Sequence, residues 1–196
     1  MKKNSYSKNP KLLFGEFLMR VTALVGSPRK KGNTDILIDH ILKGAKQAGA
    51  STKKIYLYDQ TILPCADCKR CLDESKCSEN DDMQKIYKEL DKSDAIIFGT
   101  PLYWHSMSAK MKLLVDRLRP YTVNNKLRGK KAVIVIPSDE GGKACKDLIK
   151  LFTRIFNTLG LNYVGNICVK AHDKGEVLNQ PKSLEKAYNV GVSIVK

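Results

Sequence analysis

Four of the six cysteines fall in one short run, at Cys65, Cys68, Cys71 and Cys77. Their spacing is C-x2-C-x2-C-x5-C. Three thiolates at every third position can surround one face of an iron–sulfur cubane, and the fourth can close the remaining corner. Zinc is the main alternative, although structural zinc sites usually pair two knuckles that a longer insert separates. A thioredoxin-like dithiol would need only two of the four. The pattern therefore favours a [4Fe–4S] cluster, with zinc second.

A second candidate site is the loop Gly26–Thr34, with the sequence Gly-Ser-Pro-Arg-Lys-Lys-Gly-Asn-Thr, which leads directly into an expected helix. Hydroxyls, backbone N–H groups and a helix N-terminus favour a phosphate, and the basic side chains add full positive charge. The loop lacks the G-x-G-x-x-G spacing of a dinucleotide site and the ending of a Walker A loop. It fits a terminal monophosphate, as in FMN. The alternative is a plain basic turn with Asn33 or Thr34 as N-cap.

A third candidate site is the loop Thr100–Ser108, which holds the only Trp of the chain beside a Tyr and a His. Aromatic and apolar groups at the carboxyl end of a strand suit a planar heterocycle. The alternative is that Tyr103 and Trp104 cover the core and His105 lies at the surface. A further loop, beginning at Ser138, could close over the same ring.

The remaining basic and thiol groups near these loops receive a simpler interpretation. Lys110, Lys112, Arg117 and Arg119 are expected to face solvent on the helix after the third loop. Cys145 and Cys168 are expected to be ordinary small core residues in a helix and a strand.

Apolar runs that indicate strands alternate along the chain with segments of helical period. The expected strands are Val21–Gly26, Lys54–Tyr58, Asp94–Thr100, Ala132–Pro137 and Asn162–Val169. The expected helices are Thr34–Ala48, Asp82–Leu90, Ser108–Arg119, Lys143–Leu159 and Leu184–Val195. Strict alternation predicts an α/β fold, a flavodoxin-like, doubly wound five-stranded parallel sheet in the order 2-1-3-4-5, with helices on both faces. Such sheets bind ligands at the carboxyl ends of their strands, at the switch point.

The length of 196 residues suits one domain. We expect residues 1–18 to be an N-terminal extension and residues 19–196 to be an FMN-binding domain with the cysteine segment 65–77 as an insertion. No signal peptide or membrane span is expected, since the apolar runs are short, and a cytoplasmic location follows. The formal net charge of +15 favours an acidic partner. Lys and Arg are spread along the chain without a nucleic-acid-binding motif, so we expect no nucleic acid and no membrane among its partners.

Taken together, the motifs resemble those of the iron–sulfur flavoprotein family, within the wider NADPH-dependent FMN reductase-like group. The resemblance rests on the Gly-Ser-Pro-Arg and Gly-Asn-Thr segments of the first loop, the cysteine run, Asp81-Asp82-Met83, Pro101-x-Tyr103, Lys112 and Asp116-Arg117. It extends from about Met19 through the fourth strand. The cysteine spacing is its most specific element, because FMN reductases in general share the phosphate-loop and Pro-x-Tyr motifs.

The resemblance implies a flavodoxin-like fold that holds FMN and a [4Fe–4S] cluster. It further implies that electrons pass between a ferredoxin-like donor, the cluster and FMN. It also implies a homodimer or homotetramer with both cofactors near a subunit interface. The residues expected to bind FMN are Ser27, Arg29, Asn33 and Thr34 at the phosphate, Pro101, Leu102, Tyr103, Trp104 and His105 along the ribityl chain and ring, and Ser138. The cysteines would hold the cluster. No side chain is expected to be catalytic in itself, since the cofactors carry the chemistry.

Two positions depart from the pattern of the family. His105 stands where a smaller residue is expected, and Asp139-Glu140 replaces a more glycine-rich stretch. An acidic pair beside the flavin would disfavour a nicotinamide phosphate, and this favours electron transfer over nicotinamide oxidation. The alternative is an NAD(P)H-dependent FMN or quinone reductase whose cysteines bind zinc or no metal. A redox-sensing nucleic-acid-binding module is a third and weaker interpretation.

Overall fold

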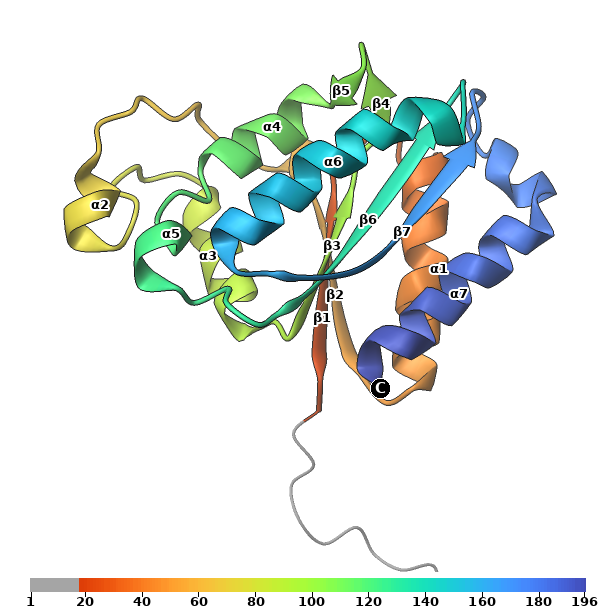
Figure 1. The fold of residues 1–196 in the computed structure, drawn as a ribbon, viewed down its shortest axis with the longest axis horizontal. Coiled ribbons are helices and arrows are strands. Elements are labelled where there is room, and N and C mark those ends of the chain that lie inside the picture. Colours follow the sequence, from red (N-terminus) through yellow and green to blue (C-terminus); the bar gives the residue numbers. More distant parts are fainter. Residues whose placement is uncertain (1–17) are drawn as a thin grey trace, which may run out of the picture.

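A parallel sheet of five strands forms the centre of the molecule (Figure 1). The structure is a computed structural model that describes residues 18–196, so the predicted extension lies almost wholly outside the described residues. The strands of the sheet are β1 (Arg20–Val25), β2 (Ser51–Tyr56), β3 (Ala95–Gly99), β6 (Lys131–Ser138) and β7 (Asn162–Lys170). Their order is β2-β1-β3-β6-β7, which confirms the predicted order 2-1-3-4-5.

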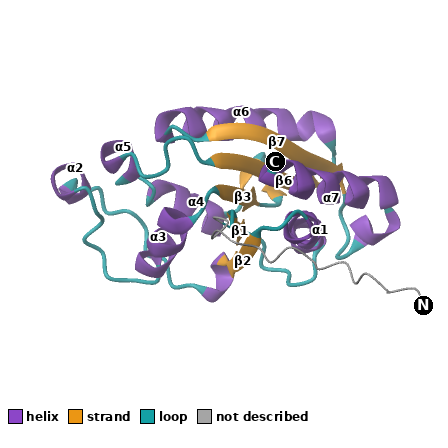
Figure 2. Ribbon diagram, turned by 90° about the horizontal axis from the view of Figure 1, so that it is seen from below, coloured by secondary structure: helices purple, strands orange, loops and turns teal. Residues whose placement is uncertain are grey.

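Helices cover both faces of this sheet (Figure 2). One face packs against α1 (Asn33–Gln47) and α7 (Pro181–Val195), and the other packs against α3 (Met83–Lys92), α4 (Ala109–Asp116) and α6 (Gly142–Leu159). Successive side chains of a strand point to opposite faces. In β1, Val21, Ala23 and Val25 therefore join the first core, whereas Leu24 joins the second. Burial on both faces explains the continuous apolar runs of the sequence.

The sequence did not indicate the shorter elements. They are η1 (Leu57–Asp59), α2 (Arg70–Glu74), β4 (Leu102–Tyr103), β5 (Ser106–Met107), α5 (Tyr121–Asn124) and η2 (Glu176–Asn179). Strands β4 and β5 form an antiparallel hairpin within the predicted ring-binding loop. Helix α2 lies in the cysteine segment, which Figure 1 places at the end of the molecule opposite α7. Among residues 18–196, no helix combines the length and apolar character needed to span a bilayer.

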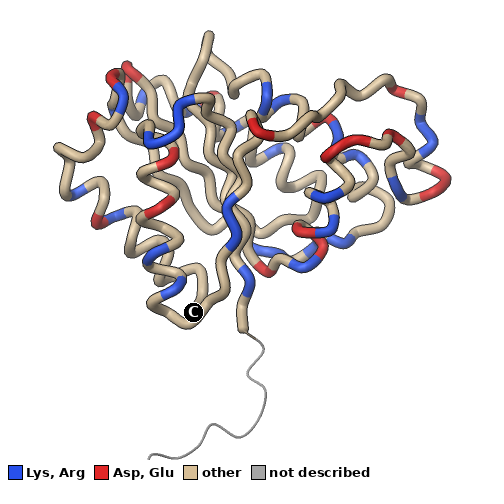
Figure 3. The backbone as a smooth tube through the Cα atoms, turned by 180° about the vertical axis from the view of Figure 1, so that it is seen from behind, with Lys and Arg blue, Asp and Glu red and all other residues tan. Residues whose placement is uncertain are grey.

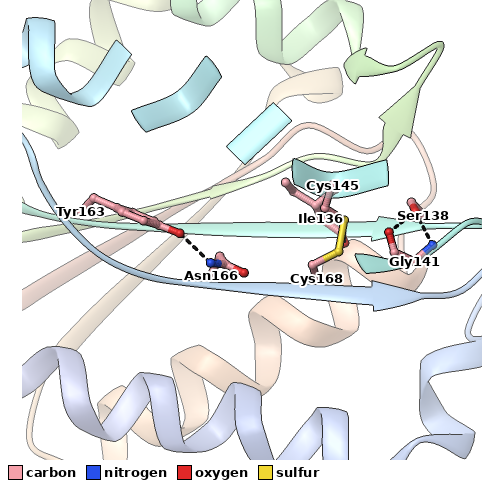
Figure 4. Close-up of a disulfide and its surroundings, with 7 residues drawn as sticks. All are labelled: Ile136, Ser138, Gly141, Cys145, Tyr163, Asn166 and Cys168. Carbon is pink, nitrogen blue, oxygen red and sulfur yellow. Dashed lines mark hydrogen bonds between the residues drawn. A yellow bond between two sulfur atoms is a disulfide. The ribbon is translucent and has the colours of Figure 1, made fainter. Parts of the chain in front are cut away.

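Cys145 is buried in the core and Cys168 packs against it, but the expectation that they are ordinary small core residues is wrong. They form a disulfide that joins α6 to β7 (Figure 4). The start of α6 lies over the carboxyl end of β7, and this brings together two cysteines separated by 23 positions in sequence. The contact depends on how a helix packs on a strand, a property that neither segment reveals by itself.

Candidate functional site

A pocket opens at the carboxyl edge of the sheet, where β1, β3, β6 and β7 end. It is lined by Ser27, Arg29, Asn33, Thr34, Pro101, Leu102, Tyr103, Pro137, Ser138, Asp139, Ala171, His172 and Lys174. Eight of the ten residues predicted to bind FMN are in this set. They come from the loops after three different strands, and the parallel fold brings those loops to one edge.

The N-terminus of α1 faces this pocket through Asn33 and Thr34. The first N–H groups of a helix have no intrahelical partner, and no side chain caps α1 at Gly32. A Cβ atom at Gly32 would lie 2.8 Å from the carbonyl oxygen of Arg29, so only glycine fits this tight turn. The free N–H groups and the nearby guanidinium of Arg29 together form an anion site. This arrangement fits the terminal phosphate of FMN.

A buried carboxylate, that of Asp35 in the first turn of α1, fixes the conformation of the preceding loop. Its Oδ2 accepts a hydrogen bond of 2.7 Å from the backbone N–H of Lys31, which has a positive φ of 57°. Its Oδ1 accepts bonds from the Lys54 ammonium at 2.7 Å and from the Tyr56 hydroxyl at 2.9 Å. Burial alone would raise the pKa of Asp35, but these donors lower it below its ordinary value. Asp35 is therefore ionised and holds the loop in one conformation.

The loop after β7 also contributes to the pocket, and the sequence interpretation missed it. The amide of Asn33 donates to the carbonyl of Asp173 at 2.8 Å, and its carbonyl accepts from the N–H of Val177 at 3.3 Å. The Asn33 side chain therefore anchors this loop, which leaves its backbone N–H for a ligand. His172 and Lys174 reach the pocket from the same loop. The predicted strand order could have indicated this contribution, because β7 ends at the same edge of the sheet as β6.

Two predicted ring-binding residues do not line the pocket. Trp104 and His105 form the turn of the β4–β5 hairpin and have positive φ values of 46° and 62°. Such two-residue turns normally carry Asn-Gly, because other residues adopt this conformation at a cost. Trp104 as a whole residue is 95% exposed. Contact between these side chains and the flavin ring stays a prediction.

The four clustered cysteines line a second pocket, together with Pro64, Ala66, Lys69, Arg70, Ser78, Glu79, Arg117 and Arg119. Cys65 and Cys68 are exposed, Cys77 is half-buried and Cys71 is buried. The cavity measures about 170 Å³, well above the roughly 10–15 Å³ that a cavity needs to hold one water molecule. Four basic side chains against one carboxylate make its lining positive. Four thiols around a positive cavity of this size fit an anionic cluster.

Within the described part of the chain, no three His, Cys, Asp or Glu side chains converge closely enough to hold a single metal ion. This holds for the four clustered cysteines as well, which line one cavity. Burial raises the pKa of the Cys71 thiol and the other three thiols act in the same direction, while Arg119 opposes them.

The backbone of the cysteine segment is unusual. Asp67, Lys69 and Ser75 have positive φ values of 50°, 62° and 56°. Non-glycine residues adopt this region rarely, and such positions concentrate where the chain wraps a functional group. The end of the segment is anchored, because the amide of Gln84 donates to the carbonyl of Cys77 at 3.0 Å.

The expectation that Arg117 faces solvent is wrong. The helix α4 ends at Asp116, before Pro120, and the Arg117 side chain turns inward, where it is 1% exposed. It pairs with Asp81, and this charge pairing makes its burial possible. Burial would raise the pKa of Asp81, but Arg117 and two backbone N–H donors, from Leu63 and Met83, lower it. The pair holds the cysteine segment against α3 and α4.

The comparisons with known proteins agree with this geometry. A model of the family described as NADPH-dependent FMN reductase matches residues 19–174. An iron–sulfur flavoprotein of Methanocaldococcus jannaschii is 34% identical over 188 residues, which cover 91% of this chain and 96% of the relative. The chain belongs to the iron–sulfur flavoproteins of the NADPH-dependent FMN reductase family.

Two further comparisons extend this assignment. An iron–sulfur flavoprotein of Archaeoglobus fulgidus is 29% identical over 178 residues, which cover 91% of this chain and 80% of the relative. The solved NAD(P)H:quinone oxidoreductase from Methanothermobacter marburgensis superposes with a TM-score of 0.73 at 17% identity, covering 90% of this chain and 96% of the other. That likeness shows the fold.

As a member of this family, the flavoprotein is a flavin-dependent oxidoreductase whose cofactor is FMN. The pocket at the edge of the sheet offers FMN an anion site, and Pro101, Leu102 and Tyr103 offer apolar and aromatic surface beside it. Of the acidic pair, Asp139 lines the pocket, whereas Glu140 does not.

Proposed function

We propose that this flavoprotein passes electrons between a ferredoxin-like donor, a [4Fe–4S] cluster held by Cys65, Cys68, Cys71 and Cys77, and FMN at the carboxyl edge of the sheet. The observation that carries the proposal is the gathering of all four cysteines around one positively lined cavity. The names of the relatives support it. The cluster would supply one-electron transfer and FMN would supply one- or two-electron transfer.

Helix α4 connects the two sites. At its N-terminus the Ser108 hydroxyl bonds to the carbonyl of Gly26, and the Ser108 N–H bonds to Thr100 at 2.9 Å, so this end is fixed to the flavin-side loops. At its other end Arg117 lines the cysteine pocket. Eight helical residues span about 12 Å, so this short helix links the loops that carry Ser27 and Pro101 to Arg117 in the cysteine pocket.

The donor would be an acidic protein. The net charge of +15 favours steering of an anionic partner toward this chain. Figure 3 shows Lys and Arg on elements throughout the described chain rather than on one of them. Lys69, Arg70 and Arg119 lie beside the cysteine pocket and would meet the donor there.

The test of transfer is anaerobic reduction by a reduced ferredoxin, followed by stopped-flow absorbance of the flavin. We expect the rate to fall steeply with added salt, because exposed charges are screened. In the Cys77→Ser variant, FMN should stay bound while its reduction by ferredoxin slows at least tenfold. A salt-independent rate, or an unchanged rate in Cys77→Ser, would contradict the proposal.

A second candidate function is NAD(P)H-dependent reduction of FMN or a quinone, with zinc or no metal at the cysteines. The description of the family favours it. Asp139 in the pocket lining disfavours it, since a carboxylate repels the phosphate groups of NADPH. Rapid steady-state oxidation of NADPH without ferredoxin would establish this function in place of the first.

We also propose that the chain acts as a homodimer or homotetramer in the cytoplasm. An apolar groove adjoins the cysteine pocket and shares Cys65 and Arg119 with it, and its lining includes Val115, Leu118 and Ile155. A second copy could cover this groove. Light scattering after size exclusion should give at least twice the monomer mass of 22.0 kDa, and a monomer would refute the assembly.

A further inference from the structure

Arg117 is the most deeply buried charged side chain that lines the cysteine pocket. Its side chain is 1% exposed, whereas that of Arg119, which lines the same pocket, is 35% exposed. A guanidinium in this position has exchanged water for protein partners. Each of its N–H groups therefore needs an acceptor, because a buried donor without one has lost its hydrogen bonds to water and gained none in return.

Two of the three guanidinium nitrogens have such acceptors. The Nη1 atom donates to the carbonyl of Leu63 at 2.9 Å and to Oδ2 of Asp81 at 2.6 Å. The Nη2 atom donates to Oδ1 of Asp81 at 3.2 Å. Among residues 18–196, the buried Nε atom has no partner. The carboxylate of Asp81 clamps the planar group, so that the direction of the Nε–H bond is fixed.

Cys77 lies on the side of the pocket where Arg117 and Tyr87 meet. It lines this pocket together with Arg117, and it lines a neighbouring pocket together with Tyr87. The Tyr87 hydroxyl donates to the carbonyl oxygen of Arg117. Burial raises the pKa of Tyr87, and Cys77 acts in the same direction. Cys71 is buried and Cys77 is half-buried, whereas Cys65 and Cys68 lie at the exposed side.

We propose that Arg117 donates its Nε–H to a sulfur of the cluster in this pocket and thereby raises the reduction potential of the cluster. This inference rests on the proposed presence of the cluster. Reduction adds one negative charge. A buried positive charge and a hydrogen bond to sulfur stabilise the more negative state, and both are recognised determinants of cluster potentials. The Asp81 carboxylate offsets part of the positive charge of Arg117. The directed hydrogen bond is therefore the larger contribution of Arg117 to the reduction potential.

The first test is the midpoint potential of the cluster, measured by an anaerobic titration followed by electron paramagnetic resonance. The Arg117→Lys variant keeps the charge but lacks the Nε–H donor. We expect its cluster to become harder to reduce by at least tenfold in the reduction equilibrium, which is about 59 mV for one electron. The matched control is Arg119→Lys, an exposed change at the same pocket, for which we expect less than a twofold change.

The second test needs no change in the Arg117–Asp81 pair. Protein grown with ¹⁵N-arginine should show a ¹⁵N hyperfine coupling to the reduced cluster in pulsed resonance spectra. That coupling should persist in Arg119→Lys and Arg70→Lys, which remove the other arginines of the pocket. This experiment decides the question even if Arg117→Lys fails to assemble its cluster.

The outcomes separate the two proposals. A wild-type protein without iron and sulfide would refute the proposed function. A wild-type cluster with no arginine coupling would refute the role of Arg117 alone, and so would an unchanged potential in Arg117→Lys.

Discussion

Replacing Asp35 by Asn should weaken both the fold and the flavin site, although Asp35 touches neither the ring nor the phosphate in our account. Its carboxylate accepts hydrogen bonds from Lys31, Lys54 and Tyr56, and its side chain is 3% exposed. Asparagine keeps the shape but removes the charge and one acceptor. Hydrogen bonds to a charged group contribute about 1.5–3 kcal/mol each, and breaking a buried ion pair costs about 3–5 kcal/mol. Because Lys54 keeps its ion pair with Asp39, we expect the free energy of unfolding to fall by about 2–3 kcal/mol, less than for a fully broken pair.

The chain offers a matched control. Asp39 pairs with the same ammonium of Lys54, at 2.6 Å, but its side chain is 55% exposed. Exposed pairs contribute about 0–1 kcal/mol, so Asp39→Asn should lose less than about 1 kcal/mol. The assay is urea unfolding of the apoprotein. With a slope near 2 kcal/mol/M, the midpoint of Asp35→Asn should fall by about 1–1.5 M at an unchanged slope. Equal losses in the two variants would refute this account of the buried carboxylate.

The effect should also depend on pH in one direction. Folding lowers the pKa of Asp35, so its contribution is present above the ordinary aspartate value of about 3.9. That contribution is lost as the pH falls through the lowered value of the folded state. The stability difference between wild type and Asp35→Asn should therefore be full at neutral pH and shrink below about pH 4. A difference that stays constant down to pH 2 would contradict this assignment.

Three further predictions concern the flavin pocket and the core. Arg29→Ala should weaken binding of FMN by about tenfold to hundredfold, measured by flavin fluorescence, and should leave riboflavin binding unchanged, because riboflavin has no phosphate. Replacing Trp104-His105 by Asn-Gly should relieve the positive-φ turn and raise the free energy of unfolding by about 1–2 kcal/mol. Replacing Cys145 and Cys168 by Ala should lower the free energy of unfolding of the apoprotein by at least about 3 kcal/mol, the estimate for a loop of this length, whereas Cys68→Ala should leave it unchanged.

The sequence was sufficient to predict the sheet and its strand order, and eight of the ten residues predicted to bind FMN line one pocket. The spacing of apolar residues and the alternation of strands with helices are local properties of the sequence. The parallel topology that they predict then brings the loops after the strands to one edge of the sheet. Ser27 and Pro101 could be placed in one pocket on this basis alone. Helix ends were less predictable. Helix α7 begins three residues earlier than expected, at Pro181, where proline suits the first turn.

What the sequence could not indicate depends on packing between elements. The burial of Arg117 requires Asp81 from a different helix terminus, and the disulfide requires α6 to lie on β7. His172 lines the pocket because the Asn33 side chain, more than a hundred positions away in sequence, bonds to the carbonyl of the next residue, Asp173. The local sequence around an arginine or a cysteine is the same whether or not a partner distant in sequence packs against it, so it does not predict the pairing.

The central claim is that the four clustered cysteines hold an iron–sulfur cluster in an FMN protein. Its most direct test is to measure iron, acid-labile sulfide, zinc and FMN in protein purified without oxygen. We predict iron, sulfide and FMN in a ratio of four to four to one, with no zinc, and loss of iron and sulfide but not of FMN in Cys77→Ser. Stoichiometric zinc without sulfide, or iron and sulfide unaffected by Cys77→Ser, would contradict the claim.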